Sequence, residues 1–155
     1  MAEELIQLET WAAPLLAKLA PQGRRQLAAT IARVLRRSQQ QRIAAQTAPD
    51  GTPYAPRKKP GDRFRDKKGR IRRKQGAMFN KLRAARWLKA NATAEGAEVA
   101  FVSRVVRIAR VHQEGLDDRA APGGKSIRYP QRPLLGFSEH DRNQVLDLLL
   151  HHLAP

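Results

Sequence analysis

Apolar residues recur at helical spacing in the first part of the chain, over residues 3–19 and again over residues 24–46. The two stripes consist of Leu5, Leu8, Trp11, Leu15 and Leu19, then Leu27, Ile31, Val34 and Leu35. Pro14 lies within the first stripe and is expected to kink or split that helix, because proline lacks a backbone N–H. A short connection separates the stripes, so the pattern predicts an N-terminal helical hairpin.

The helical pattern breaks over residues 48–76, which contain four prolines and very few apolar residues. Between Arg57 and Lys74 there are eleven lysines or arginines against two aspartates, a local net charge of +9 out of +16 for the whole chain. A loop of this length inside a small domain is unusual and is typically functional or disordered. We therefore expect residues 48–76 to form a long basic loop or arm.

The pattern after the basic loop mixes helical and strand periods. Apolar residues around Met78 suggest a short helix. The alternation over residues 86–102 predicts a β-hairpin with its turn at Glu95 and Gly96. Residues 104–112 then fit the stripe of a further helix.

In the last part of the chain, glycine, proline and serine mark the expected ends of the elements. Gly115 is expected to end the helix before it, and residues 116–126 read as a second, shorter loop. Residues 127–135 look like an edge strand, because Pro130 and Pro133 cannot donate ladder hydrogen bonds. Ser138 has the properties of an N-cap for a final helix that ends near Leu153.

This order of elements predicts an α+β fold with a small, mostly antiparallel sheet, in a single domain over residues 1–155. The hairpin and the strand at 127–135 are expected to lie in one sheet, with the helices at 24–46 and 138–153 packed on it. The residues expected to be largely buried are Leu27, Ile31, Val34, Val99, Phe101, Ile108, Leu135, Val145 and Leu149.

The composition excludes several classes of protein. The chain has no cysteine, which rules out disulfides and cysteine-based zinc sites. No apolar run approaches the ~20 residues that span a bilayer, and the first residues are acidic, unlike the basic start of a signal peptide. We therefore expect a protein made in the cytoplasm and without a membrane segment.

No catalytic or metal-binding motif is visible. The serines have no nucleophile motif around them, and Ser138 is explained as a helix cap. His151 and His152 are neighbours on a helix and point about 100° apart, so they do not form a ligand pair. His112 closes an apolar stripe and is expected to be a buried structural histidine. The sequence therefore predicts neither an enzyme nor a bound metal or cofactor.

The basic loop is the main candidate for a binding site. Its composition leaves three interpretations open: a solvated linker, a segment that binds DNA phosphates, and an arm that orders on an acidic partner protein. Aromatic residues that could stack on bases are limited to Tyr54 and Phe64. The candidate residues are Arg57, Lys58, Lys59, Arg63, Arg65, Lys67, Lys68, Arg70, Arg72, Arg73 and Lys74.

Three segments, residues 35–58, 77–115 and 128–153, together resemble the phage virion morphogenesis, or tail-completion, proteins of temperate phages with contractile tails. The most specific pieces are PDGTPYAP, RIARVHQEG and YPQRPLLGFS. The first is turn chemistry leaving a helix, the second a helix end stopped by glycine, and the third a proline-marked strand before a capped helix. Phage-tail-like bacteriocins carry similar tail genes, so a phage and such a particle are both candidate sources.

The resemblance implies a non-enzymatic assembly protein without a cofactor. Members of this family act at the head-proximal end of the tail, where they form rings that terminate the tube or join the tail to the head. A hexamer is therefore expected, with tail tube or sheath subunits and head–tail connector proteins as partners. The protein would be made in the host cytoplasm and then occupy the neck region of the virion tail. A terminator ring and an adjacent joining ring are both compatible with the resemblance.

Two further expectations concern contacts. An edge strand leaves backbone groups that a neighbouring subunit can use, so the ring-interface candidates are Tyr129, Pro130, Arg132 and Pro133. The alternative to an assembly protein is a basic nucleic-acid-binding protein that contacts DNA phosphates non-specifically through residues 57–74.

Overall fold

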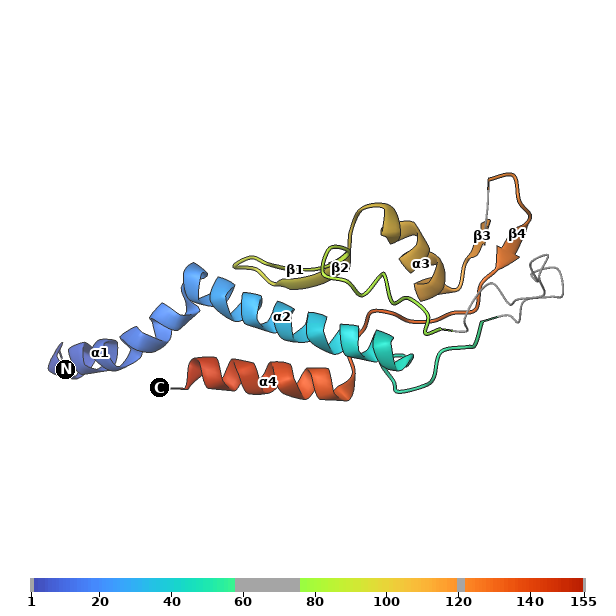
Figure 1. Cartoon of the computed structure of the whole chain (residues 1–155). Coiled ribbons are helices and arrows are strands. Elements are labelled where there is room, and N and C mark those ends of the chain that lie inside the picture. The colour runs from blue at the N-terminus through green and yellow to red at the C-terminus, as the bar shows by residue number, and fades with distance from the viewer. Residues whose placement is uncertain (1, 58–75, 120–121, 155) are drawn as a thin grey trace.

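The structure is a computed structural model that describes residues 2–57, 76–119 and 122–154. Its longest helix, α2 (Pro21–Ala45), runs through the molecule, and α4 (Glu139–Leu153) packs along one side of it. The hairpin of β1 (Leu88–Ala92) and β2 (Ala97–Phe101) packs along another side of α2 (Figure 1). The α+β class predicted from the sequence is confirmed, and α2 is the element that both layers share.

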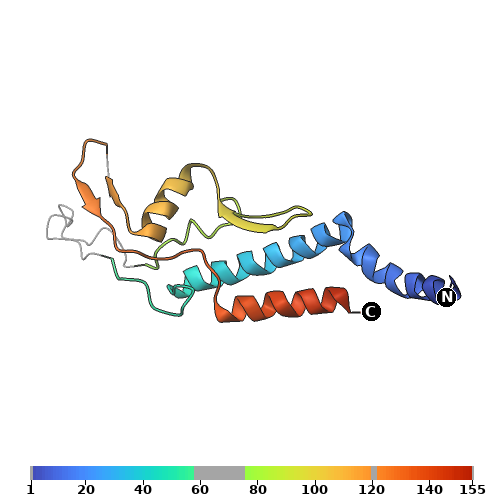
Figure 2. The same cartoon turned by 180° about the vertical axis from the view of Figure 1, so that it is seen from behind.

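Helix α1 (Ala2–Leu19) is joined to α2 by Ala20 alone. Ala20 has φ −59° and ψ 157°, the extended conformation that a residue before proline favours, and Pro21 then begins α2. Figures 1 and 2 show the two helices meeting at an elbow, with α1 leading away from the body. A link of one residue is shorter than the roughly two to five residues of a closed helical hairpin. The two predicted helices are therefore present in an open arrangement, and Pro14 lies inside an unsplit α1.

The buried face of α2 shares Leu35 with the predicted stripe and otherwise lies one residue further along the helix. Its buried residues are Ala28, Ala32, Leu35, Gln39 and Ile43. Leu27, Ile31 and Val34 are half-buried and lie beside this line. The helix is packed both by the hairpin and by α4, so its contacts spread over more than one stripe.

Strands β1 and β2 form the antiparallel hairpin predicted for residues 86–102, in a register that pairs Leu88 with Phe101. The turn is closed by a hydrogen bond of 2.9 Å from Thr93 N–H to Gly96 O. The prediction of this hairpin is confirmed.

A second antiparallel pair, β3 (Asp117–Arg119) and β4 (Ser126–Arg128), lies at the end of the molecule opposite to α1 (Figure 1). The two described sheets share no strand. The prediction that the hairpin and residues 127–135 belong to one sheet is therefore wrong. Residues 116–126, which were predicted to be a second, shorter loop, include β3 and the first residue of β4.

Helix ends follow the local sequence closely. A 3-10 turn over Ser103–Val105 leads into α3 (Val106–Glu114), which ends at Gly115 with a left-handed φ of 67°. Helix α4 begins at the capping box of Ser138, whose hydroxyl accepts from Asp141 N–H while the Asp141 carboxylate accepts from Ser138 N–H. Both predicted helix boundaries are confirmed.

Residues 129–138 run past the end of α3 without joining a strand, which explains the wrong prediction of one sheet. The Tyr129 N–H donates to Leu116 O at 3.1 Å, and the Arg132 N–H donates to His112 O at 2.6 Å. Pro130 and Pro133 have no N–H to add. Two backbone N–H groups of this segment therefore donate to α3 and to the residue just after its end, and not to a neighbouring strand.

The short helix predicted around Met78 is instead a run of turns. Phe79 has a positive φ of 65°, which a continuous right-handed helix does not contain. Leu82 N–H donates to Phe79 O at 2.9 Å, which closes one of these turns. Met78 and Leu82 are nevertheless buried, as their apolar side chains indicate.

The core gathers where the end of α2, the turns and α3 meet. Its buried members are Ile43, Ala48, Tyr54, Met78, Leu82, Val105, Ala109 and Leu134. Of the residues predicted to be largely buried, most are half-buried in the subunit, while Ile108 and Leu149 are exposed. None of the helices in the described part of the chain combines the length and apolar content needed to cross a bilayer.

Candidate functional site

The predicted basic arm begins at Arg57, which is exposed, and its other ten cations lie outside the described residues. The chain on both sides of the arm is held at the C-terminal end of α2. The backbone carbonyl of Gln46 accepts from Tyr54 N–H at 2.8 Å. The Gln46 side chain accepts from Met78 N–H at 2.7 Å and donates to Met78 O at 2.9 Å. One residue therefore fixes both roots of the arm.

Arg132 fixes the chain immediately before the arm. Its side chain is buried, with the residue 4% exposed, and its Nε donates to Ala55 O at 2.7 Å. Its Nη2 donates to Pro56 O at 3.0 Å. Burial lowers the pKa of Arg132, and Arg57 lowers it further. Because a guanidinium only donates hydrogen bonds, Arg132 uses its donors to hold the carbonyls of Ala55 and Pro56 in place. Arg132 therefore acts as a structural clamp.

His112 lies against the same guanidinium. Arg132 Nη1 is 3.2 Å from His112 Nδ1, and because a guanidinium only donates, Nδ1 is the acceptor. Burial lowers the pKa of His112, with additional lowering from Arg132 and Arg57 and a small opposing effect of Asp118. The ring also makes edge contacts with Phe79 and Tyr129. The structure thus places His112 as a neutral, hydrogen-bonded side chain, as predicted from the sequence, but half-buried rather than buried.

Gln113 holds the proline-marked segment to α3. Its Oε1 accepts from Leu134 N–H at 2.8 Å and from Leu135 N–H at 2.9 Å. Its Nε2 donates to Leu135 O at 3.0 Å. The Gln113 side-chain amide thus supplies hydrogen bonds that a neighbouring strand would otherwise give. The sequence pattern did not predict this role of Gln113.

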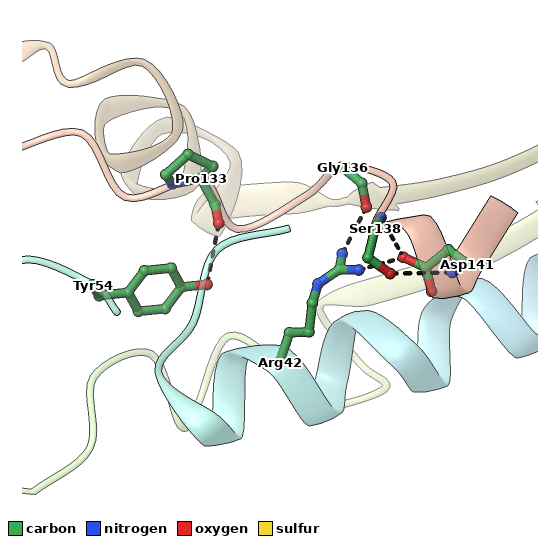
Figure 3. Close-up of polar contacts among 6 residues, drawn as sticks. All are labelled: Arg42, Tyr54, Pro133, Gly136, Ser138 and Asp141. Carbon is green, nitrogen blue, oxygen red and sulfur yellow. Dashed lines mark hydrogen bonds and ion pairs between the residues drawn. The ribbon is translucent and has the colours of Figure 1, made fainter. Parts of the chain in front are cut away.

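An enclosed ion pair joins α2 to the start of α4 (Figure 3). Arg42 Nη1 binds Asp141 Oδ2, and Arg42 Nη2 donates to Gly136 O at 2.6 Å. Burial alone would raise the pKa of Asp141, but hydrogen bonds from Ser38, Ser138 and Arg42 lower it below its ordinary value. The carboxylate, which is 0% exposed, therefore stays ionised and fixes α4 to α2.

Tyr54 connects the root of the arm to the proline-marked segment. Its hydroxyl donates to Pro133 O at 3.2 Å (Figure 3). Burial raises the pKa of Tyr54 to about 12, while Arg42 acts in the opposite direction. The phenol is therefore a neutral donor in any physiological medium.

The four ring-interface candidates differ in how much surface they offer. Pro130 is exposed and Tyr129 is half-buried. Pro133 is half-buried with its carbonyl bound by Tyr54, and Arg132 is enclosed by contacts within the subunit. Among the four candidates, Tyr129 and Pro130 thus offer the most surface for a neighbour, while Arg132 holds the segment in place.

Two helices carry exposed leucines, among them Leu15 and Leu19 of the predicted apolar stripe and Leu149, which was predicted to be largely buried. They are Leu15, Leu16 and Leu19 on α1 and Leu146, Leu149, Leu150 and Leu153 on α4. A detectable signal was present in α4, because its apolar residues occupy more than one face of the helix. No group of three or more histidine, cysteine, aspartate or glutamate side chains in the described ranges could hold a metal ion.

Comparison with known proteins gives two matches. A family model described as the phage virion morphogenesis family matches residues 3–154. The chain is also similar to tail completion protein S of Escherichia phage P2, with 46% identity over 140 residues that cover 90% of each protein. No solved structure gives a significant match.

Proposed function

The chain belongs to the phage virion morphogenesis family, and on that basis we propose that it completes the tail of a phage, or of a related phage-tail-like particle, at the head-proximal end. The observation that carries the proposal is the 46% identity to tail completion protein S over 90% of both chains. The proposed role is structural assembly and involves no catalytic step.

In this proposal the copies form a six-fold ring that terminates the tube or joins the tail to the head. Tail tube or sheath subunits contact one side of the ring and head–tail connector proteins contact the other. The protein is made in the host cytoplasm and afterwards occupies the neck of the particle. The exposed Pro130 and half-buried Tyr129 support a role of residues 129–133 in contacts between neighbours.

The basic arm, residues 57–74, is proposed to bind an acidic surface of a neighbouring copy, of the adjoining ring or of the tube. Its +9 charge supports this, and so does the rigid attachment of its roots through Gln46 and Arg132. Contact with DNA phosphates is the second candidate, favoured by the same eleven cations. The scarcity of stacking aromatics favours the protein partner.

The proposed function is tested by deleting the gene for this protein from the genome that encodes the particle. Electron microscopy of the lysate is expected to reveal heads and tails that fail to join or tails of uncontrolled length, and a wild-type copy of the gene should restore complete particles. A particle map should place the subunit as a six-fold ring at the head-proximal end. Normal particles without the gene would refute the tail-completion role, and another symmetry would refute the hexamer.

A further inference from the structure

A recess between α2 and the turns that lead into β1 is lined mainly by polar side chains, and none of the described residues that line it is acidic. Its volume is about 470 Å³. The polar walls are Arg37, Gln40 and Gln41 from α2 and Asn80 and Arg83 from the turns, and two alanines complete the lining. The two guanidinium groups carry positive charge and only donate hydrogen bonds, so the recess favours an anion.

The turn that carries Arg83 is fixed to α2. Gln40 Nε2 donates to Arg83 O at 2.7 Å, and Arg83 N–H donates to Phe79 O at 3.3 Å. Phe79 has a positive φ, a backbone conformation that is costly for a bulky residue and that recurs at functional sites. The subunit therefore holds Arg37 and Arg83 beside the same recess before any ligand is present.

The subunit supplies no counter-charge to the two arginines of the recess. Neither takes part in an ion pair between described residues, whereas Arg42 on the same helix is paired with Asp141. The Nε of Arg83 is buried and has no acceptor among the described residues. Buried polar groups nearly always have a hydrogen-bond partner. The recess therefore lacks an acceptor that its arginines require.

We propose that this recess binds an aspartate or glutamate side chain from an acidic segment of another protein of the particle. The planar carboxylate matches the fork of a guanidinium and accepts two parallel hydrogen bonds from it. A recess admits a side chain that projects from its backbone, and the alanines can contact the methylene groups of that side chain. Duplex DNA instead presents closely spaced phosphates, which a row of cations on an open surface fits better.

A second copy of this chain is a poor source of that carboxylate. The chain contains 30 lysines and arginines against 14 aspartates and glutamates, so two copies repel each other. Four of its carboxylates are already bound by arginines within the subunit. The inference rests on the proposed assembly role and adds a contact through residues other than those of the basic arm.

Arg83→Lys allows a direct test in assembled particles, because it places a primary amine at the recess. A carbodiimide joins such an amine to a carboxylate in contact with it, and mass spectrometry maps the link. A link from residue 83 to an aspartate or glutamate of another particle protein is expected. The matched control is Arg86→Lys, an exposed position that does not line the recess, which should give no link at residue 86. The proposal is overturned if particles that contain Arg83→Lys give no link at residue 83, a link only to another copy, or equal links at residues 83 and 86.

A second variant measures whether the contact is needed. Arg37→Gln with Arg83→Gln should leave the monomer folded, as judged by circular dichroism, and lower its incorporation into particles by at least about tenfold. The matched control, Arg119→Gln with Arg142→Gln, removes the same charge from exposed positions elsewhere and should incorporate normally. Normal incorporation of the recess variant would overturn this contact, whether or not its affinity for duplex DNA falls. The proposed tail-completion role is tested separately, by gene deletion.

Discussion

At the scale of single residues, the ion pair of Arg42 and Asp141 carries the attachment of α4. Of the ion pairs between described residues, it is the one enclosed on both sides, whereas the arginines of the others are largely exposed. Exposed pairs contribute little to stability, and breaking an enclosed pair leaves a buried charge uncompensated. The same carboxylate caps α4, so one side chain serves both the tertiary contact and the local helix start.

The substitution Asp141→Asn should therefore destabilise the subunit by about 3 kcal/mol, because it leaves the Arg42 guanidinium without its counter-charge. The free energy of unfolding in urea measures the effect. Asp147→Asn, an exposed carboxylate on the same helix, is the control and should change stability by less than about 0.5 kcal/mol. Equal stability of the two variants would contradict the role assigned to Asp141.

His112 gives a second prediction at this scale, a loss of stability on mild acidification. Its folded-state pKa is lowered by burial and by Arg132, so the unfolded chain, with a histidine pKa near 6.5, takes up the proton first. Stability from this residue is thus complete above pH 6.5 and is lost as the pH falls toward the lower folded pKa.

Urea unfolding between pH 7 and pH 5 measures this dependence. His112→Gln should lower stability at pH 7 and show a weaker loss between pH 7 and pH 5 than the wild type. His140→Gln, at an exposed position, should retain the wild-type pH profile. An unchanged profile in the His112 variant would exclude this histidine as the source.

At the scale of elements, local sequence signals predicted the helix ends and the hairpin correctly. Predictions that depended on contacts between residues distant in sequence were less accurate. Ser138 and Gly115 act within a few residues, so the sequence around them was sufficient. The strand expected at 127–135 is limited to residues 127 and 128 of β4, because Gln113 and the end of α3 supply hydrogen bonds to the residues that follow. The buried line of α2 was displaced because two layers pack on it, which a single stripe does not reveal.

The end of α3 can be tested with Gly115→Ala. An alanine there would hold a left-handed φ of 67°, at a cost of about 1–2 kcal/mol. Its Cβ would also lie 3.0 Å from the Cβ and backbone nitrogen of Gln131. The control is Gly51→Ala, where φ is 85° and no atom lies within 4 Å of the added Cβ. Thermal unfolding should show the larger loss for Gly115→Ala, and equal losses would mean that the approach of Gln131 is not tight.

At the scale of the whole molecule, the structure is elongated, with α1 at one end and β3, β4 and the start of the basic arm at the other (Figure 1). Composition alone selected residues 57–74 as the candidate arm, because their eleven cations are concentrated in 18 residues. The residues that hold its roots, Gln46 and Arg132, were not recognisable in that role, because their partners are distant in sequence. The separation of the two ends suits a subunit that binds different neighbours at each.

The basic arm, residues 57–74, gives a prediction for the assembled particle. Replacing Arg70, Arg72, Arg73 and Lys74 with serine should preserve soluble expression and fold but prevent tail completion, because an arm that docks on an acidic partner loses four charges. Particle yield and circular dichroism measure the two effects. Replacing the exposed Lys81, Lys89, Lys125 and Arg142 with serine removes the same charge elsewhere and should leave particle yield unchanged.

Two results would change this view of the arm. Normal yields from the arm variant would mean that the segment is only a solvated linker. Intact assembly together with lost binding to duplex DNA, measured at several salt concentrations, would favour the DNA interpretation.

The attachment of both roots of the arm to Gln46 has a consequence for how members of this family can diverge in sequence. Since it fixes both Tyr54 and Met78, the chain between them begins and ends on a preformed base. Doubling the length of such a connection costs only about 0.6 kcal/mol in closure entropy. Insertions, deletions and exchange of this stretch between genomes are therefore compatible with an unchanged scaffold. Recombination can therefore exchange the segment between Tyr54 and Met78 to suit a different particle while the rest of the protein stays unchanged.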